Sequence, residues 1–340
     1  MNIRFYDSLN YIKKYNSRRI WNLILVWTSF HLSKLFKKSL HLGMPVSASI
    51  EPTTSCNLRC PQCPSGLRSF SRPTGMLQMD MFRDTIDQLA PTLTYLILYF
   101  QGEPYLNPDF LGFVNYAHQK NIYTATSSNA HHISEKMAEE TVKSGLDRLI
   151  ISIDGVTQDT YKEYRVGGSL DKVLQSTQNL LQWKKKLKSK TPHIIWQFIV
   201  FKHNEHQIPA FKDLAKTYGV DDWAIKTAQV YDYENGNDLI PDDGRYSRYE
   251  EVHTNGFSLK NKMLDHCWRM WQGCVITWDG KVVPCCFDKD AEFRMGNLES
   301  QSFVKIWKGE AYKNFRSKIL GGRKNISICQ NCTEGTKVWD

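Results

Sequence analysis

The sequence predicts an α/β protein: a partial, TIM-like (β/α)6 barrel followed by a small C-terminal unit made of a β-hairpin and a helix. Three observations support this fold class. Short apolar runs alternate with helical patterns six times within residues 46–230, as in sheets of parallel strands. Residues 267–340 hold six of the nine cysteines and a hairpin pattern. Hydrophobic residues make up 41% of the 340 residues, which is enough for a sizeable core.

Residues 1–45 form a basic, amphipathic arm ahead of the first expected strand. Residues 1–43 carry eight Lys and Arg side chains and a single acid, Asp7, so this arm supplies +7 of the formal net charge of +9. Its apolar side chains recur at mostly helical spacing: Ile20, Trp21, Leu23, Ile24, Trp27, Phe30 and Phe36. Two interpretations fit this pattern, a helix that lies on an acidic membrane surface or a helix packed on the body with its basic edge in water.

The remainder of the chain is close to neutral, because +9 less +7 leaves +2. It therefore has no basic footprint for a nucleic acid, and we expect no nucleic-acid partner. The apolar stretch Ile20–Trp27 is too short to span a bilayer, which takes roughly 20 apolar residues. It also starts late and has no small-residue cleavage site after it, so no secretory signal is indicated.

Residues 46–230 are expected to form the barrel. The apolar runs are of the kind that is buried in parallel sheets. The predicted strands are Val46–Ile50, Tyr95–Phe100, Tyr123–Ser127, Leu149–Ile153, Ile194–Val200 and Trp223–Lys226. The helical patterns between them are Met79–Leu89, Phe110–Lys120, Ser134–Ser144, Leu170–Leu187 and His206–Tyr218. Six units are two short of a closed eight-fold barrel, so we expect an open barrel with its active site at the carboxyl ends of the strands.

Two further segments follow the barrel. Residues 231–266 are polar and contain the turn signal Pro241–Gly244, which predicts a linker. In residues 267–340, Asp279-Gly280 separates the β-rich runs Val275–Trp278 and Lys281–Val283, a pattern typical of a hairpin.

The nine cysteines indicate metal binding rather than a disulfide framework. Their number is odd, and they fall into two groups, at 56–63 and 267–332. Clustered thiols of this kind are typical of a reducing compartment, so we expect a cytoplasmic protein.

The first group follows the first expected strand directly. Cys56, Cys60 and Cys63 can wrap a four-iron cubane, whose irons take thiolate ligands. Three cysteines leave one iron open to a small chelating ligand, which makes the site chemical rather than only structural. A zinc knuckle is the alternative, but zinc takes four protein ligands in structural sites and neither a histidine nor a fourth cysteine lies nearby.

This Cys-x3-Cys-x2-Cys motif resembles the signature of the radical S-adenosylmethionine (SAM) superfamily. The resemblance implies that Cys56, Cys60 and Cys63 hold a [4Fe–4S] cluster whose open iron binds the amino and carboxylate groups of SAM. One electron, supplied by a reductase such as flavodoxin or ferredoxin, then splits the sulfonium into methionine and a 5′-deoxyadenosyl radical. The radical abstracts a hydrogen atom from the substrate, while the protein supplies position and excludes water.

Segments at the following strand ends extend the resemblance. Gln101-Gly102-Glu103-Pro104 is similar to the Gly-Gly-Glu-Pro motif that receives the SAM ammonium, with Gln101 in place of the first glycine. This departure affects only the path of the loop, and an ordinary turn is the alternative to a SAM-binding segment. Ser127-Ser128-Asn129 resembles a looser motif beside the SAM pocket, for which a simple asparagine turn is equally suitable.

Two more positions match the family. Ile151–Gly155 resembles Ser-x-Asp-Gly, which implies that Ser152 lies near the SAM carboxylate, while Asp154 either joins it or caps the next helix. Arg165 matches an arginine that reaches the same carboxylate, to which a guanidinium is suited by bidentate pairing. A surface arginine is the alternative.

The second group resembles the SPASM extension of radical SAM enzymes, in its shorter, twitch-like form with a single auxiliary cluster. The match to its opening consists of Cys267, Gly280 after twelve intervening residues, and Cys285 after four more. The match to its closing pair is Cys329-x2-Cys332. The resemblance implies an auxiliary [4Fe–4S] cluster on Cys267, Cys285, Cys329 and Cys332 in a small iron–sulfur domain. Cys286 is the alternative to Cys285 as a ligand, and Cys274 is expected to be a buried apolar residue. A zinc site is the alternative to the iron–sulfur cluster.

These features predict a radical SAM oxidoreductase or maturase for a peptide or small-molecule substrate. A cluster with four cysteine ligands has no open iron, so its expected role is to accept an electron from the substrate. Asp288 is a candidate base for a substrate proton, with a turn residue as the alternative. About 46 residues precede the first expected strand, fewer than a leader-binding domain needs. The competing function is a non-catalytic iron–sulfur or zinc protein for binding or electron transfer.

Overall fold

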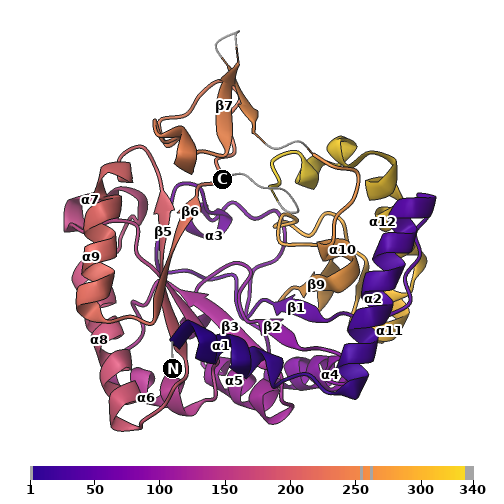
Figure 1. Cartoon of the computed structure of the whole chain (residues 1–340), viewed down its shortest axis with the longest axis horizontal. Coiled ribbons are helices and arrows are strands. Elements are labelled where there is room, and N and C mark those ends of the chain that lie inside the picture. The colour runs from indigo at the N-terminus through magenta and orange to yellow at the C-terminus, as the bar shows by residue number, and fades with distance from the viewer. Residues whose placement is uncertain (1–2, 253–255, 261–262, 334–340) are drawn as a thin grey trace.

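A nine-stranded sheet forms the centre of the molecule (Figure 1). The computed structural model describes residues 3–252, 256–260 and 263–333. The strands lie in the order β11-β10-β9-β1-β2-β3-β4-β5-β6. The first six in the chain are β1 (Ser47–Ile50), β2 (Tyr95–Ile97), β3 (Tyr123–Ser128), β4 (Arg148–Ser152), β5 (His193–Val200) and β6 (Asp222–Thr227).

Strands β1 to β6 form the predicted partial barrel. Each pairs in parallel with the next in the chain, and neighbouring strands are joined by helices. The order has two free ends, β6 and β11, so the described strands form an open sheet rather than a closed barrel. The prediction of an open α/β barrel with six units is therefore confirmed.

The helices between these strands begin and end where local chemistry favours it. The long ones are α4 (Met79–Leu89), α5 (Phe110–Gln119), α6 (Glu135–Lys143), α8 (Leu170–Lys186) and α9 (Ile208–Tyr218). Ser134 and Ser169 accept backbone N–H groups at the starts of α6 and α8. Gly219 ends α9 in the left-handed conformation. Helix α7 (Gln158–Tyr164) is an additional short helix, and Arg165 is its C-cap residue.

The C-terminal hairpin extends the barrel sheet. Strand β9 (Gly273–Ile276) pairs in parallel with β1, and β10 (Lys281–Val283) pairs antiparallel with β9 and with β11 (Gly296–Asn297). Gly280 has φ +76° in the turn between β9 and β10, which confirms the predicted hairpin. Helices α10 (Arg269–Gln272), α11 (Phe303–Trp307) and α12 (Glu310–Gly322) complete this part.

The segment that was expected to be a linker contains a small ribbon. Strands β7 (Tyr249–Val252) and β8 (Gly256–Leu259) pair antiparallel and project from the rim of the barrel (Figure 1). Tyr249 anchors the ribbon, because its hydroxyl donates to the Val230 carbonyl and its side chain is buried.

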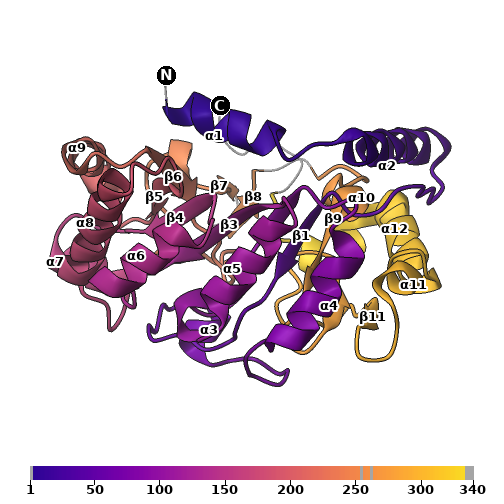
Figure 2. The same ribbon diagram turned by 90° about the horizontal axis from the view of Figure 1, so that it is seen from below.

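The N-terminal arm consists of α1 (Ile3–Ile12) and α2 (Ser17–Phe36), which lie along one side of the molecule, outside the sheet (Figure 2). Asp7 pairs with Arg148 and with the Tyr123 hydroxyl, at the amino ends of β4 and β3. Arg19 is buried and donates to four backbone carbonyls, among them those of Ala90 and Asn121. Polar contacts therefore fix the arm to the barrel.

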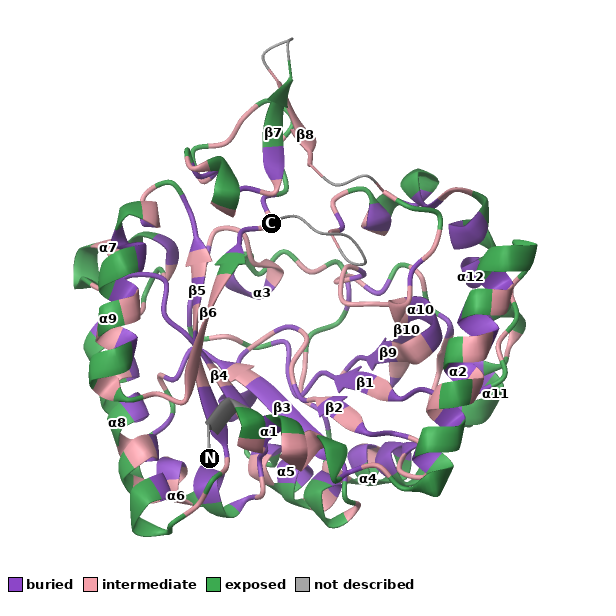
Figure 3. Cartoon of the chain, in the orientation of Figure 1, coloured by how far each residue is buried: buried purple, intermediate pink, exposed green. Residues whose placement is uncertain are grey.

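Helix α2 contacts the body through a face that is mostly small and polar. Its buried residues are Arg19, Asn22, Val26, Ser29, Phe30 and Ser33. Trp21, Ile24 and Trp27 of the predicted apolar face are exposed instead, and Figure 3 shows buried and exposed positions alternating along the helix. The helix does pack on the body, but with much of its apolar face in water. In the described part of the chain, none of the helices has the length and apolar character needed to cross a membrane.

Candidate active site

The first three cysteines lie on the loop from β1 to the short helix α3 (Pro64–Leu67). The Cys63 N–H donates to the Cys60 carbonyl at 3.2 Å, which closes a tight turn. Gly66 lets α3 approach this turn, because a Cβ there would lie 2.6 Å from the Cys60 nitrogen. All nine cysteines lie in the described residues, and none forms a disulfide.

A cavity of about 120 Å³ opens beside these thiols. Cys56, Cys60 and Cys63 line it together with residues from three successive strand ends. The predicted SAM-binding residues in its wall are Gly102, Glu103, Ser127, Asn129, Ser152 and Arg165. Three thiols and a polar wall facing one space fit a cluster with one open iron and a zwitterionic ligand on it. Gln101 and Asp154, which were predicted with them, do not line this cavity.

Glu103 is buried and holds the end of β3 in place. Its carboxylate accepts hydrogen bonds from the Ser128 hydroxyl and the Asn129 N–H, each at 2.7 Å. Burial raises the pKa of Glu103 to about 6, against the effect of these hydrogen bonds. A nearby cation would stabilise the charged form of this buried carboxylate, so Glu103 is suited to bind the ammonium of an amino acid.

Gly102 is required by the path of the loop after β2. It has φ +73°, and a Cβ would lie 2.2 Å from the Thr53 carbonyl oxygen. Its N–H donates to the Ser65 hydroxyl at 2.8 Å, which joins this loop to α3. The neighbouring Gln101 is buried without lining the cavity, so the departure from the family motif falls outside the wall of the pocket.

Arg165 is held against the first cysteines by Asp154. The Arg165 Nε donates to Asp154 Oδ2 at 2.6 Å, and its Nη1 lies 3.8 Å from the Cys60 sulfur. Asp154 also accepts the Ile199 N–H at 2.7 Å and is fully buried. These contacts favour a positioning role for Asp154 and leave Arg165 as the group that faces the pocket.

The second set of cysteines gathers around a smaller cavity. Cys267, Cys285, Cys329 and Cys332 all line it, although they come from a loop, the end of the hairpin and the C-terminal turn. The buried Arg323 donates to the Cys332 sulfur at 3.0 Å, which supplies positive charge where thiolates would gather. Four thiols around one space, with a buried cation beside them, fit an anionic four-cysteine cluster.

Cys286 and Cys274 lie elsewhere. Both line a larger cavity of about 570 Å³ and neither lines the smaller one, so the structure favours Cys285 over Cys286 as a cluster ligand. Within the described ranges, no group of three or more His, Cys, Asp or Glu side chains is arranged to hold a single metal ion. The shared cavities are therefore the observation on which both ligand sets rest.

Asp288 stabilises the turn that follows it. Its carboxylate accepts the N–H groups of Glu292 at 2.8 Å and Phe293 at 3.0 Å, and its side chain is 1% exposed. Burial raises its pKa, but it does not line the larger cavity. These contacts favour the turn residue over the candidate base.

The larger cavity touches both cysteine groups. Cys60 and Cys63 lie in its wall, as do Cys285 and Cys286. Its basic residues include three that sequence reasoning missed: Lys226, Arg248 and Arg269. Arg248 lies in the supposed linker, and none of the three belongs to a recognisable motif. Only their convergence in space reveals them.

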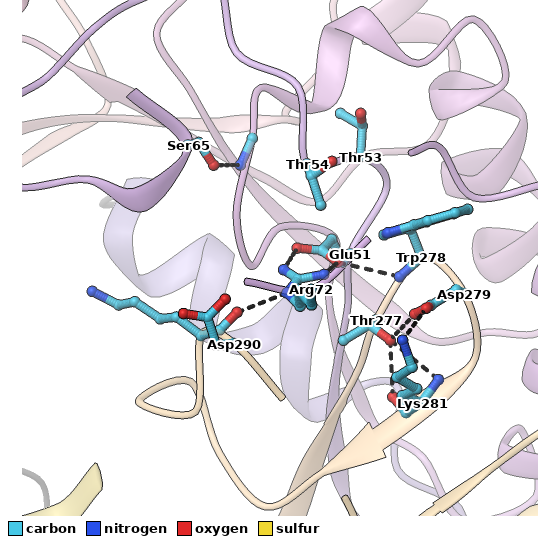
Figure 4. A network of polar contacts seen from close by, with 12 residues as sticks. Glu51, Thr53, Thr54, Ser65, Arg72, Thr277, Trp278, Asp279, Lys281 and Asp290 are labelled. Atoms are coloured by element: carbon cyan, nitrogen blue, oxygen red, sulfur yellow. Dashed lines mark hydrogen bonds and ion pairs between the residues drawn. The ribbon is translucent and has the colours of Figure 1, made fainter. Parts of the chain in front are cut away.

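A buried ion pair joins the first cysteine loop to the C-terminal part (Figure 4). Arg72 contacts both oxygens of Glu51, at 2.6 and 2.9 Å, and both side chains are buried. The Trp278 N–H donates to the same carboxylate at 3.2 Å, and the Arg72 Nε donates to the Lys289 carbonyl at 2.8 Å. The loop that follows the cysteines is thereby fixed to the hairpin and the segment after it.

Comparison with known families identifies the two domains of the chain. The profile of the radical SAM superfamily matches residues 50–199, and that of the SPASM iron–sulfur cluster-binding domain matches residues 267–333. The chain belongs to the radical SAM superfamily. As a radical SAM enzyme with a SPASM domain it uses [4Fe–4S] clusters and SAM, which decides against the zinc and the non-catalytic alternatives.

Relatives of this radical SAM enzyme are spread over bacteria and archaea. The cofactor-modifying protein of the tungsten-containing aldehyde ferredoxin oxidoreductase from Pyrococcus furiosus is 24% identical over 78% of this chain and 82% of its own length. The mycofactocin maturase MftC from Mycobacterium tuberculosis is 26% identical over 86% of this chain and 76% of its own.

Solved structures share the fold. Streptococcus suis SuiB bound to S-adenosylmethionine matches with a TM-score of 0.63 and 17% identity, over 90% of this chain and 76% of its own. BtrN in complex with AdoMet and 2-DOIA matches with a TM-score of 0.52 and 16% identity, over 86% of this chain and 94% of its own.

Proposed function

We propose that this enzyme oxidises an anionic substrate held between its two clusters. One observation carries the proposal: the wall of a single cavity of about 570 Å³ contains Cys60 and Cys63 of the first cysteine group and Cys285 of the second. A substrate in this space lies beside the site that generates the radical and beside a cluster that can take up an electron.

Cys56, Cys60 and Cys63 would hold the first cluster, and Cys267, Cys285, Cys329 and Cys332 the second. With SAM bound, the first would supply a 5′-deoxyadenosyl radical for removal of a hydrogen atom from the substrate, and the second would supply an acceptor for the electron that remains. The chain positions the reactants. Arg165 is placed to pair with the SAM carboxylate and Glu103 to receive its ammonium, while Gly102 keeps the loop close enough for both.

The electron balance needs an external donor. One electron enters to cleave SAM; the substrate would then lose a hydrogen atom to the 5′-deoxyadenosyl radical, which becomes 5′-deoxyadenosine, and afterwards a proton and an electron. That electron would leave the second cluster for an oxidised carrier protein or return to the first cluster, so that the cycle balances. We propose a flavodoxin- or ferredoxin-type reductase as the donor. Four thiols, Cys267, Cys285, Cys329 and Cys332, leave no open iron for a substrate in the second set, which supports electron acceptance as its role.

The lining of the cavity supports an anionic group on the substrate. Its basic residues are Arg165, Lys226, Arg248 and Arg269, and within the described part of the chain no Asp or Glu belongs to its wall. Arg165 is engaged by Asp154, and Arg248 donates to the hydroxyl and the carbonyl of Thr227 in the same wall. A carboxylate or phosphate would be attracted there because both groups pair strongly with guanidinium.

The fold leaves both substrate classes open. SuiB, bound to the precursor peptide SuiA, and BtrN, bound to 2-DOIA, share it. We therefore propose a peptide or a small molecule that carries a carboxylate or phosphate, and the screen below includes both.

The test is an anaerobic assay with dithionite and SAM, in which 5′-deoxyadenosine is quantified for the wild type and for Cys60→Ala. We expect product from the wild type and none from the variant. Peptides and small molecules are then screened in matched pairs with and without a carboxylate or phosphate, and the anionic member of a pair should stimulate product formation.

The role of the second cluster is tested on Cys329→Ala with the substrate so found. We expect 5′-deoxyadenosine to form while the oxidised product falls by at least about tenfold, because the substrate radical keeps its electron. Full turnover by Cys329→Ala would overturn electron acceptance, and stimulation by neutral compounds alone would overturn the anionic substrate.

A further inference from the structure

The outer side of the N-terminal helices is apolar. Of the seventeen large hydrophobic side chains that are exposed among the described residues, ten lie between residues 5 and 42. Trp21 is 61% exposed, Trp27 55% and Leu35 73%. A concentration of this kind marks an interaction surface, whereas single exposed hydrophobic residues are ordinary.

The exposed side chains form one stripe along α2. Ile20, Ile24, Trp27 and Leu35 follow one another at intervals of three, four or eight residues, which places them on one face of a helix. Phe5 and Ile12 of α1 and Leu42 beyond α2 add further exposed apolar side chains. The apolar area therefore continues beyond α2 on either side in the sequence.

Hydrogen bonds prevent α2 from turning this stripe inward. On the opposite face, the Asn22 side chain donates to the Met44 carbonyl at 2.9 Å and accepts the Met44 N–H at 2.8 Å. The Ser33 hydroxyl donates to the Ser29 carbonyl and bonds the backbone of Leu40. A rotation that buried the tryptophans would leave these buried polar groups unpaired.

Every charged side chain that the arm exposes in its described part is basic. These side chains are Lys13, Arg18, Lys34, Lys37 and Lys38. The one acid, Asp7, is buried against Arg148 and Tyr123. On a helical projection Lys34 lies next to Trp27, at one border of the apolar stripe.

We propose that α1 and α2 rest on the surface of a bilayer that contains anionic lipid, with α2 parallel to the membrane plane. The apolar stripe would enter the boundary between headgroups and acyl chains, where tryptophan is favoured, and the basic border would contact anionic headgroups. A second copy of this chain is a poorer occupant, because face-to-face contact would bring two basic borders together. This inference is independent of the proposed substrate.

The test uses the full chain and vesicles of phosphatidylcholine, with or without 30% phosphatidylglycerol. We expect co-sedimentation with the anionic vesicles that weakens as salt is added. Trp21→Gln/Trp27→Gln should lower vesicle partitioning by roughly tenfold or more. The matched control Leu187→Gln/Val252→Gln, which changes two side chains of 39% and 41% exposure elsewhere, should leave partitioning unchanged.

Iron content and 5′-deoxyadenosine formation in vesicle-free buffer show that the tryptophan variant is folded, since neither Trp21 nor Trp27 lines a cavity of the active site. Absence of wild-type binding to anionic vesicles, or equal loss in the control variant, would overturn the proposal. A concentration-dependent dimer that requires both tryptophans, without vesicle binding, would assign the surface to a second copy instead.

Discussion

At the scale of single residues, the pair of Glu51 and Arg72 shows how the first cysteine loop is held. Both side chains are buried, and burial raises the pKa of Glu51 while Arg72 opposes the shift. We expect Arg72→Met to lower the free energy of unfolding by about 3–5 kcal/mol, because it leaves a buried carboxylate without its cation. Urea unfolding under anaerobic conditions measures this.

The double variant Glu51→Gln/Arg72→Met supplies the control for that measurement. It removes both charges, so it should recover a large part of the lost stability. A single Arg72→Met variant as stable as the wild type would contradict the inferred role of the pair.

Glu103 makes stability depend on pH. Its pKa is about 6 in the folded protein, above the ordinary value of 4.5. The unfolded chain thus releases this proton at lower pH, and the contribution of Glu103 to stability falls as pH rises from 4.5 through 6. Between pH 5 and 7 the loss is about 1 kcal/mol. Denaturant unfolding of the SAM-free enzyme should show it, and Glu103→Gln should flatten the curve by that amount.

At the scale of elements, the hairpin β9–β10 decides which of two adjacent cysteines is a ligand. Cys285 lines the smaller cavity with the other three cysteines, whereas Cys286 lines only the larger one. We expect Cys286→Ala to keep about eight irons per chain and Cys285→Ala to keep about four, since each cubane holds four irons. Iron and sulfide analysis after anaerobic reconstitution measures this, and the reverse order would contradict the assignment.

Strand positions and the gathering of the first three cysteines around one cavity could be predicted because their signals are local. The run Ile194–Val200 is apolar at every position except Gln197, and Cys56, Cys60 and Cys63 lie within eight residues of one another. The pairing of β9 with β1 could not be predicted, because the sequence of neither strand specifies which strand it pairs with. Lys226, Arg248 and Arg269 were missed for the same reason, since they meet only in the folded chain.

The sequence pattern also did not determine which face of α2 packs against the body. Its apolar residues favoured burial, but Asn22, Ser29 and Ser33 are buried in their place. Hydrogen bonds to the backbone of Met44 and Leu40 made this packing possible, and those partners lie outside the helix. The periodicity of a sequence shows which residues share a face of a helix, but it does not show which face packs against the rest of the protein.

At the scale of the whole molecule, the inner side of the arm is fixed to the barrel at the amino ends of β3 and β4. Removal of residues 1–43 would leave Asp147 without Lys14 and Arg148 without Asp7. We expect a loss of roughly 3 kcal/mol or more in the free energy of unfolding, measured by denaturant titration. Trp21→Gln/Trp27→Gln should change it by less than about 0.5 kcal/mol. An unchanged truncated enzyme would contradict the packing of the arm.

The pairing of β9 with β1 has a consequence for the folding of the nascent chain. On the ribosome, β1 emerges roughly 220 residues before the strand that completes its pairing. At synthesis rates of roughly 5–20 residues per second, one edge of β1 waits about 10–45 s for its neighbour. An open strand edge is a template for other chains, so the yield of active enzyme should depend on how crowded and how warm the cell is while translation is under way.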